Sequence, residues 1–153
     1  MAKRLDRVLA LTGAPHPAPA AGPSPVTIDT AIVFSSLGLR GRAQGAVAQV
    51  SVVLVPGTVT MYGRTVTPAL GYGTPINIQS VSPDRAVATG DFTVVAAKVA
   101  PVFDALTAHG ITATALHSHL VGEEPKLYYM HFWADGPLPD VLRGLRAALD
   151  AAR

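Results

Sequence analysis

The stretch TATALHSHLVGEEPKLYYMHFWADG, residues 112–136, indicates the fold most directly, because it has the form of a β-hairpin. Two segments typical of strands, 111–120 and 127–134, flank a turn at 121–126 that contains a glycine and a proline. Successive side chains of a strand point to opposite faces of the sheet. The stretch therefore predicts two antiparallel strands, one face of which is rich in histidine.

The segments around this hairpin predict both helices and strands. Residues 97–109 carry apolar side chains at helical spacing, and a second amphipathic helix is expected to begin near Pro137. Further upstream we expect a short helix at 28–37 and strands at 45–55, 58–68, 74–82 and 84–95, with Pro56-Gly57 as a hairpin turn between the first two strands. This order predicts an α+β domain in which two helices pack on one face of an antiparallel sheet.

Composition divides the chain into two parts. Residues 2–12 predict a short amphipathic helix, and residues 13–25 contain five prolines without a bulky apolar side chain, as in a linker. Residues 26–153 have the length and apolar content of one α+β domain.

The overall composition excludes several classes of function. Basic residues are scattered and the net charge is only +2, so we expect no nucleic-acid partner. No apolar run approaches the roughly 20 residues that span a bilayer, and the apolar run VLALTGA near the start is interrupted by Thr12 and barely reaches the minimum length of a signal peptide's apolar region. We therefore expect a cytoplasmic protein that does not enter a membrane. The chain has no cysteine, so a metal site would need nitrogen and oxygen ligands.

Three of the five histidines lie in the hairpin, and strand alternation places them on one face. His117 and His119 share a face with Ala113 and Ala115, and the returning strand places His131 and Tyr129 on one face. A register that pairs 117 with 131 and 119 with 129 brings these side chains together, whereas a slip by one residue moves His131 to the other face.

Three imidazoles in this arrangement can bind a divalent transition metal ion. We predict His117, His119 and His131 as ligands, with Glu124 as the fourth ligand. Zinc fits this ligand set best, and iron, copper, nickel or manganese would also suit it. Glu124, Glu123 and Tyr129 are the predicted catalytic residues, and Asp91 is a weaker candidate for contact with a small-molecule substrate.

Other interpretations of the same residues stay open. The spacing H-x-H-x3-E resembles the first metal motif of cupin barrels, which makes a cupin-like β-barrel the alternative fold. The resemblance is partial, because the glycine that should follow the glutamate is absent and a helix precedes the strand. The histidines could instead form a polar sheet face or line the interface of a homo-oligomer.

The hairpin also resembles the LppY/LpqO-like family of bacterial proteins, which has no established function. The resemblance rests on GITATALHSHLVGEEPKLYYMHFWADG (110–136), and extends to ATGDFTVVAAKVAPVFDAL (88–106) and LRGLRAALD (142–150), covering about residues 45–152. It implies that His117, His119, Glu124 and His131 are functional residues and that Pro125 shapes the turn.

Several features depart from this family's pattern. Ser118 stands where asparagine is usual, and Lys98 stands where an acidic residue is common. The segment LVPGTVT, 54–60, stands where an Arg-x-Asp pair is expected. Many members carry two copies of this unit in exported chains, and we expect here a single, unexported copy. Three hypotheses follow: a metal-dependent enzyme acting on a small molecule, a non-catalytic metal- or ligand-binding module, and a structural domain with a histidine-lined oligomer interface.

Overall fold

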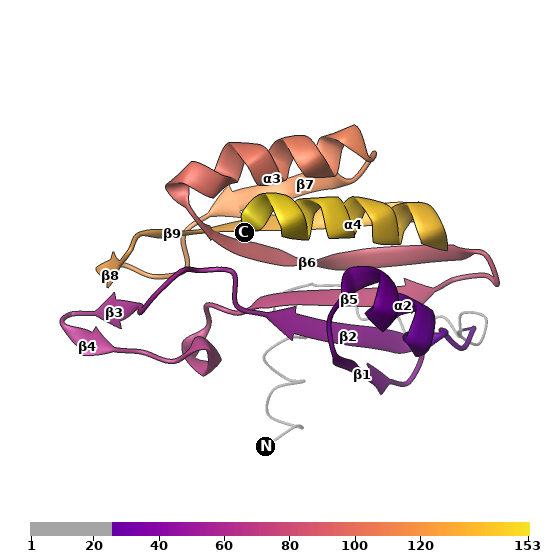
Figure 1. The fold of residues 1–153 in the computed structure, drawn as a ribbon, viewed down its shortest axis with the longest axis horizontal. Helices are drawn as coiled ribbons and strands as arrows, with labels where there is room; N and C mark the ends of the chain where they lie inside the picture. Colours follow the sequence, from indigo (N-terminus) through magenta and orange to yellow (C-terminus); the bar gives the residue numbers. More distant parts are fainter. Residues whose placement is uncertain (1–25) are drawn as a thin grey trace, which may run out of the picture.

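The structure, a computed structural model, describes residues 26–153, so the expected helix at 2–12 and the linker at 13–25 lie outside the described residues. In the described chain, groups of strands separate the three α-helices α2, α3 and α4 (Figure 1). In chain order they are α2 (Thr30–Leu37), β1 (Gly41–Gln44), β2 (Val47–Val52), β3 (Thr60–Met61), β4 (Arg64–Thr65), the 3-10 helix η1 (Pro68–Leu70), β5 (Thr74–Ser80), β6 (Arg85–Val95), α3 (Ala96–Ala108), β7 (Thr112–His117), β8 (Glu123–Glu124), β9 (Leu127–Pro137) and α4 (Leu138–Ala152).

The main sheet has six strands in the order β1-β2-β5-β6-β9-β7, and every neighbouring pair is antiparallel. The three helices lie together on one side of this sheet (Figure 1). The predicted α+β class is therefore confirmed, with α2 as a third helix in the helical layer. The cupin-like alternative is wrong for the described residues, because β1 and β7 are separate edges and the sheet does not close into a barrel.

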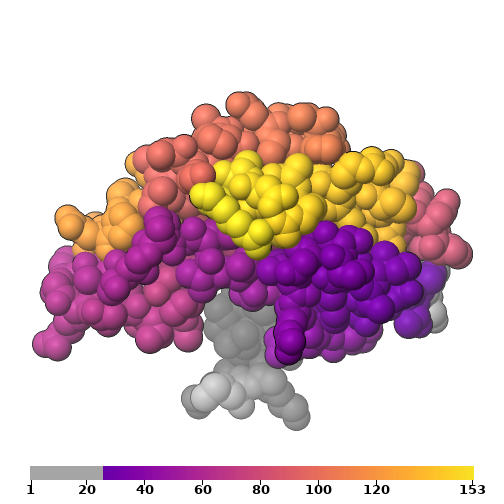
Figure 2. Space-filling view, in the orientation of Figure 1, coloured from indigo at the N-terminus to yellow at the C-terminus, as the bar shows by residue number. Residues whose placement is uncertain are grey.

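Helix α2 begins and ends at residues that the sequence predicts. Asp29 caps α2, since its carboxylate accepts hydrogen bonds from the backbone N–H groups of Ala31 (2.9 Å) and Ile32 (3.2 Å). Gly38 ends the same helix at φ 63°, a left-handed conformation that suits glycine. The helices then pack side by side, with α4 in contact with both α2 and α3, and form the continuous surface seen in Figure 2.

The main hydrophobic core lies between this helical layer and the sheet. On α4 the expected amphipathic pattern is confirmed, because Val141, Leu142, Leu145 and Leu149 are all buried. On α3 the apolar residues Val102 and Leu106 are buried, whereas Phe103 is 46% exposed beside the edge strand β7. The strands contribute alternate residues to this core, among them Ile76, Ile78, Phe92, Val94, Met130 and Phe132. Burial of these side chains is the main stabilising contribution to the fold.

The predicted hairpin between 45–55 and 58–68 is wrong. β2 pairs with β1 through a turn at Gly45 and with β5 on its other side, so it has no place for residues 58–68. Those residues instead form β3 and β4, joined by a turn at Tyr62 and Gly63, both with positive φ. With β8 they make a second sheet, in the order β4-β3-β8.

The second sheet lies at one end of the main sheet, beside the ends of β7 and β9 (Figure 1). There, a small apolar cluster joins Val55, Val59 and Tyr72 to Leu127 and Tyr129 of β9. This cluster fixes the 53–73 segment against the face of the main sheet that is turned away from the helices. That face is called the histidine face below, and it carries the alternate side chains Asp91, Tyr129, His131 and Trp133.

In the part of the chain that the structure describes, no helix is both long and apolar enough to cross a membrane.

Candidate metal site

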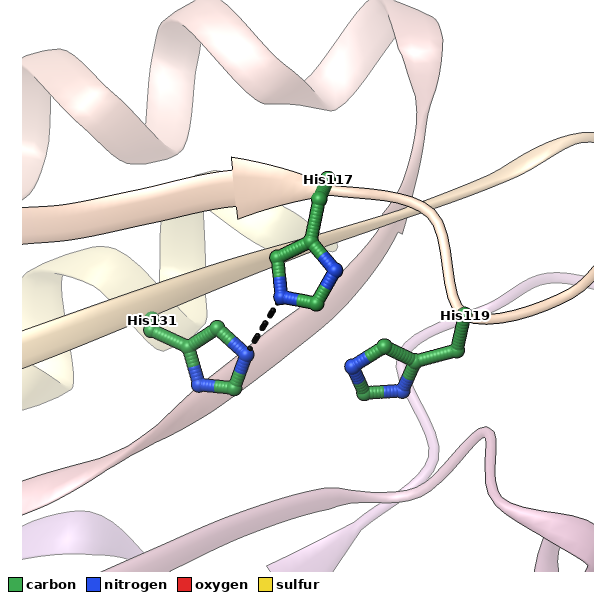
Figure 3. A group of neighbouring side chains, drawn as sticks. All are labelled: His117, His119 and His131. Atoms are coloured by element: carbon green, nitrogen blue, oxygen red, sulfur yellow. Dashed lines mark hydrogen bonds between the residues drawn. The ribbon is translucent and has the colours of Figure 1, made fainter.

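The three hairpin histidines converge at one end of the histidine face (Figure 3). His117 is the last residue of β7, His119 lies two residues beyond it in the connection to β8, and His131 lies within β9. Each residue offers one ring nitrogen, and the three nitrogens lie within 4.8 Å of one another. Among the described residues this is the one such group of histidine and acidic side chains.

The observed register differs from the predicted one by two residues. His117 pairs with Tyr129 and Ala115 pairs with His131, whereas the prediction paired 117 with 131. A shift by two residues preserves which face each side chain occupies, so His117 and His131 still share a face as diagonal neighbours. The candidate site requires only that His117 and His131 lie on the same face, so it survives the difference in register.

A bulge in β7 corrects one further prediction. Ala113 pairs with Phe132 and Ala115 with His131, so Thr114 is the extra residue between them. The extra residue reverses the alternation, and Ala113 packs against the core on the helical side instead of sharing the face of His117. Without this bulge, Ala113 could not pack on the core while His117 lies on the histidine face.

His117 and His131 are in direct contact. Their Nε2 atoms are 2.8 Å apart, and the two rings are nearly parallel, with centroids 4.9 Å apart and 14° between the planes. At this distance one nitrogen donates a hydrogen to the other. Two tetrahedral zinc ligands at about 2.0–2.1 Å from the ion would lie about 3.3–3.4 Å apart. A metal ion would thus replace the shared hydrogen with a small separation of the rings.

His119 is held by stacking instead of by strand pairing. Its ring lies on that of Tyr129, with centroids 3.7 Å apart and 20° between the planes. Tyr129 is fully buried, so it provides a fixed support for an otherwise exposed histidine. Burial and the neighbouring charge of His117 lower the pKa of His119, which favours the neutral form that binds metals.

Asp91 is the carboxylate nearest to this group by strand register. It lies on β6 directly opposite His131, and only 8% of its surface is exposed. Burial raises the pKa of Asp91, and the charges of His131, His119 and His117 oppose that rise only in part. Asp91, which the sequence suggested less strongly than Glu123 and Glu124, is therefore the carboxylate that lies beside His131.

The two glutamates of the turn have different surroundings. Glu124 is exposed in β8, pairs with Thr60, and is not part of the group of close ligand atoms. Glu123 is buried. Its Oε1 accepts a hydrogen bond from the backbone N–H of Leu127 (3.2 Å) and forms an ion pair with Nζ of Lys126 at 2.9 Å. Glu123 thus stabilises the turn that carries His119.

Tyr129, the third predicted catalytic residue, has a buried hydroxyl. Burial raises its pKa first, and the charges of Glu123 and Asp91 raise it further. Its hydroxyl oxygen, Oδ1 of Asp91 and Oε2 of Glu123 are the three buried side-chain polar atoms without a hydrogen-bond partner in the described part of the chain. Asp91 and Tyr129 lie beside the histidines, and Glu123 lies near enough to raise the pKa of Tyr129, which marks this region as a polar site within an apolar sheet.

A groove of about 490 Å³ lies farther along the histidine face. It begins at Trp133 and Thr89, the next cross-strand pair on this face after His131 and Asp91, and crosses β5 and β2 to reach β1. Its lining residues are apolar or bear amides, apart from the hydroxyl-bearing Thr89, and none of them is charged. The amides of Gln49 and Asn77 are joined by a 2.8 Å hydrogen bond. This groove was not predicted from the sequence, because its residues meet only when five strands are aligned.

The chain belongs to a protein family described as Domain of Unknown Function (DUF1259), whose model matches residues 31–151. The matched region contains the three histidines, Asp91, the whole of α3 and all but one terminal residue of α2 and of α4. No curated protein and no solved structure gives a significant match to the chain. The expectation of a family without an established function is confirmed, and the match does not extend to the LppY/LpqO-like name.

Proposed function

We propose that His117, His119 and His131 bind a divalent transition metal ion, and that the protein is a metal-dependent enzyme acting on a small molecule. The observation that carries the proposal is the convergence of three imidazole nitrogens within 4.8 Å. Three protein ligands leave a coordination position for water or substrate, which is the usual arrangement of catalytic zinc sites. Zinc is the first choice of ion, and iron, copper, nickel and manganese accept the same ligands.

The groove beside the site supports a small molecule as substrate. It opens next to Trp133, two residues along β9 from His131, so a molecule in the groove would extend toward the metal. Its uncharged lining favours a substrate whose bound part is uncharged. Glu124 as a fourth ligand, the finer assignment to LppY/LpqO-like proteins, and the cytoplasmic location remain predictions from the sequence.

Metal analysis of protein purified without a histidine tag tests the proposal. We expect about one ion per chain after incubation with zinc and desalting, and loss of that ion in His131→Ala. His109→Ala is the matched control, because His109 ends α3 and is not part of the group. Less than about 0.1 ion per wild-type chain, with no binding on titration, would exclude a metal site of useful affinity.

The interface hypothesis has a specific observation in its favour, since His117 and His119 are exposed and the neighbouring Val121 is 78% exposed. In that case His119→Ala should change the elution volume in gel filtration, with and without zinc. An unchanged volume, together with one tightly bound ion, leaves the metal site as the function of this face. An ion that is bound without an exchangeable ligand would favour a carrier over an enzyme.

A further inference from the structure

The position of Asp91 suggests what the site accepts. Asp91 and His131 are direct partners across β6 and β9, and the Cβ atoms of such partners lie about 4.5–5.5 Å apart. Asp91 as a residue is more than nine-tenths buried, and its Oδ1 is buried without a hydrogen-bond partner among the described residues. A buried acceptor of this kind destabilises the protein unless a ligand or water pairs with it.

Among the described residues, no lysine or arginine forms an ion pair with Asp91. The described titratable groups that face it are the three histidines and the hydroxyl of Tyr129. Its carboxylate is also not one of the ligand atoms that lie within 4.8 Å of one another. In this arrangement Asp91 faces whatever the three histidines hold without being a fourth member of their group.

From this geometry we propose that Asp91 is the hydrogen-bond acceptor of the site and that it selects a neutral, hydroxyl-bearing ligand over an anion. An ionised carboxylate can only accept hydrogen bonds, so a ligand beside it must donate one. Water and alcohols meet this requirement, whereas an anion would place a second negative charge within a few ångströms. The uncharged lining of the neighbouring groove is consistent with the same class of ligand.

This inference rests on the proposed metal site, and one experiment separates the two. Wild-type protein and Asp91→Asn are loaded with Co²⁺ in place of zinc, and azide is titrated while the visible spectrum is recorded. Asparagine has the same shape as aspartate, lacks the charge and can donate a hydrogen bond. We expect azide to bind Asp91→Asn about tenfold more tightly than wild type, because one nearby negative charge has been removed.

Asp104→Asn is the matched control, since it removes one carboxylate from the exposed surface of α3 on the helical side of the sheet. It should bind azide as wild type does. Asp91→Ser serves as a second variant if Asp91→Asn does not give the wild-type circular dichroism spectrum.

The outcomes are distinguishable. If wild-type protein binds no Co²⁺, the metal site and the role of Asp91 both fail. If Co²⁺ binds but the azide Kd of both Asp91 variants is within twofold of wild type, only the role of Asp91 fails. A changed Co²⁺ spectrum in Asp91→Asn before azide is added would make Asp91 a metal ligand and would overturn its role as an outer acceptor.

Discussion

The ring of His119 lies on the ring of Tyr129, with 3.7 Å between their centroids, although His119 is outside the paired part of β7. Tyr129 is also the strand partner of His117. One buried residue therefore supports two of the three histidines. Its ring stacks on His119, and its backbone pairs with His117. The position of His119 depends on this contact, because no backbone pairing in β7 extends that far.

Replacing Tyr129 should separate the role of its ring from that of its hydroxyl. Tyr129→Phe keeps the ring and removes a buried hydroxyl that has no partner, so we expect metal affinity within about twofold and no loss of stability. Tyr129→Leu removes the stacking surface, and we expect about tenfold weaker metal binding and a loss of about 2–4 kcal/mol in unfolding free energy. Competition with a chromophoric chelator and urea unfolding measure the two effects. Equal metal affinity in both variants would show that the stacking does not position His119.

Metal binding should stabilise the folded protein. An ion bound only by the native state at about 100 times its Kd adds about 2.7 kcal/mol to the free energy of unfolding. Thermal unfolding with and without excess zinc should therefore show a rise in Tm for wild type and for His109→Ala, and none for His131→Ala. A rise of equal size in His131→Ala would place the stabilising ion elsewhere.

Glu123 should make stability depend on pH in the acidic range. Burial alone would raise the pKa of Glu123, but the hydrogen bonds from Lys126 and from the backbone outweigh it, and the net pKa is lowered from 4.5. A lowered pKa means that the stabilisation is present above the unfolded-state value and is lost as pH falls through the folded-state value. At neutral pH, Glu123→Gln should cost about 1–3 kcal/mol in unfolding free energy, as expected for hydrogen bonds to a charged group.

The cost of Glu123→Gln should shrink as pH falls below about 4.5, where wild type gradually loses the same interaction. Urea unfolding at several pH values measures this difference. Glu124→Gln is the control, because Glu124 is exposed, and its effect should be small at every pH. A cost for Glu123→Gln that does not change between neutral and acidic pH would contradict a role for the charge.

Gly90 should be intolerant of any side chain. It pairs with Ile76 in the centre of the sheet, and a Cβ atom there would lie 2.1 Å from the carbonyl oxygen of Pro75. We expect Gly90→Ala to lower the unfolding free energy by more than about 2 kcal/mol, because backbone atoms must move. At Gly136, also in the sheet, the nearest atom to an added Cβ is at 3.8 Å, so Gly136→Ala should cost less than about 1 kcal/mol. Similar unfolding curves for the two variants would show that the strands separate easily at Gly90.

The strongly patterned parts of the fold were predictable from the sequence. Strands β5, β6 and β9 and helices α3 and α4 lie close to their predicted positions, because each has a long run of one hydrophobic period. The 53–73 segment was not predictable, since β3 and β4 have two residues each and leave no period to recognise. Their turn also uses Tyr62 at φ 47°, a conformation that few non-glycine residues adopt.

The candidate site was predictable in its ligands and not in its geometry. Alternation along the strands was enough to place His117 and His131 on one face. The bulge at Thr114 could not be predicted, because an extra residue in a strand changes neither composition nor hydrophobicity. Which glutamate is buried depends on the alternation within a strand of two residues, and the pairing of Asp91 with His131 depends on the register of two strands far apart in the sequence.

All three histidines come from one hairpin, and His117 and His131 are only 14 positions apart in the chain, whereas Asp91 comes from a strand on the other side of α3. Closing so short a loop costs little conformational entropy. A metal ion could thus join the two arms of the hairpin early in folding, before β6 is aligned beside them. The hairpin would then bind an ion before Asp91 reaches it. Selection of the ion's ligand by Asp91 would begin only once the whole sheet is assembled.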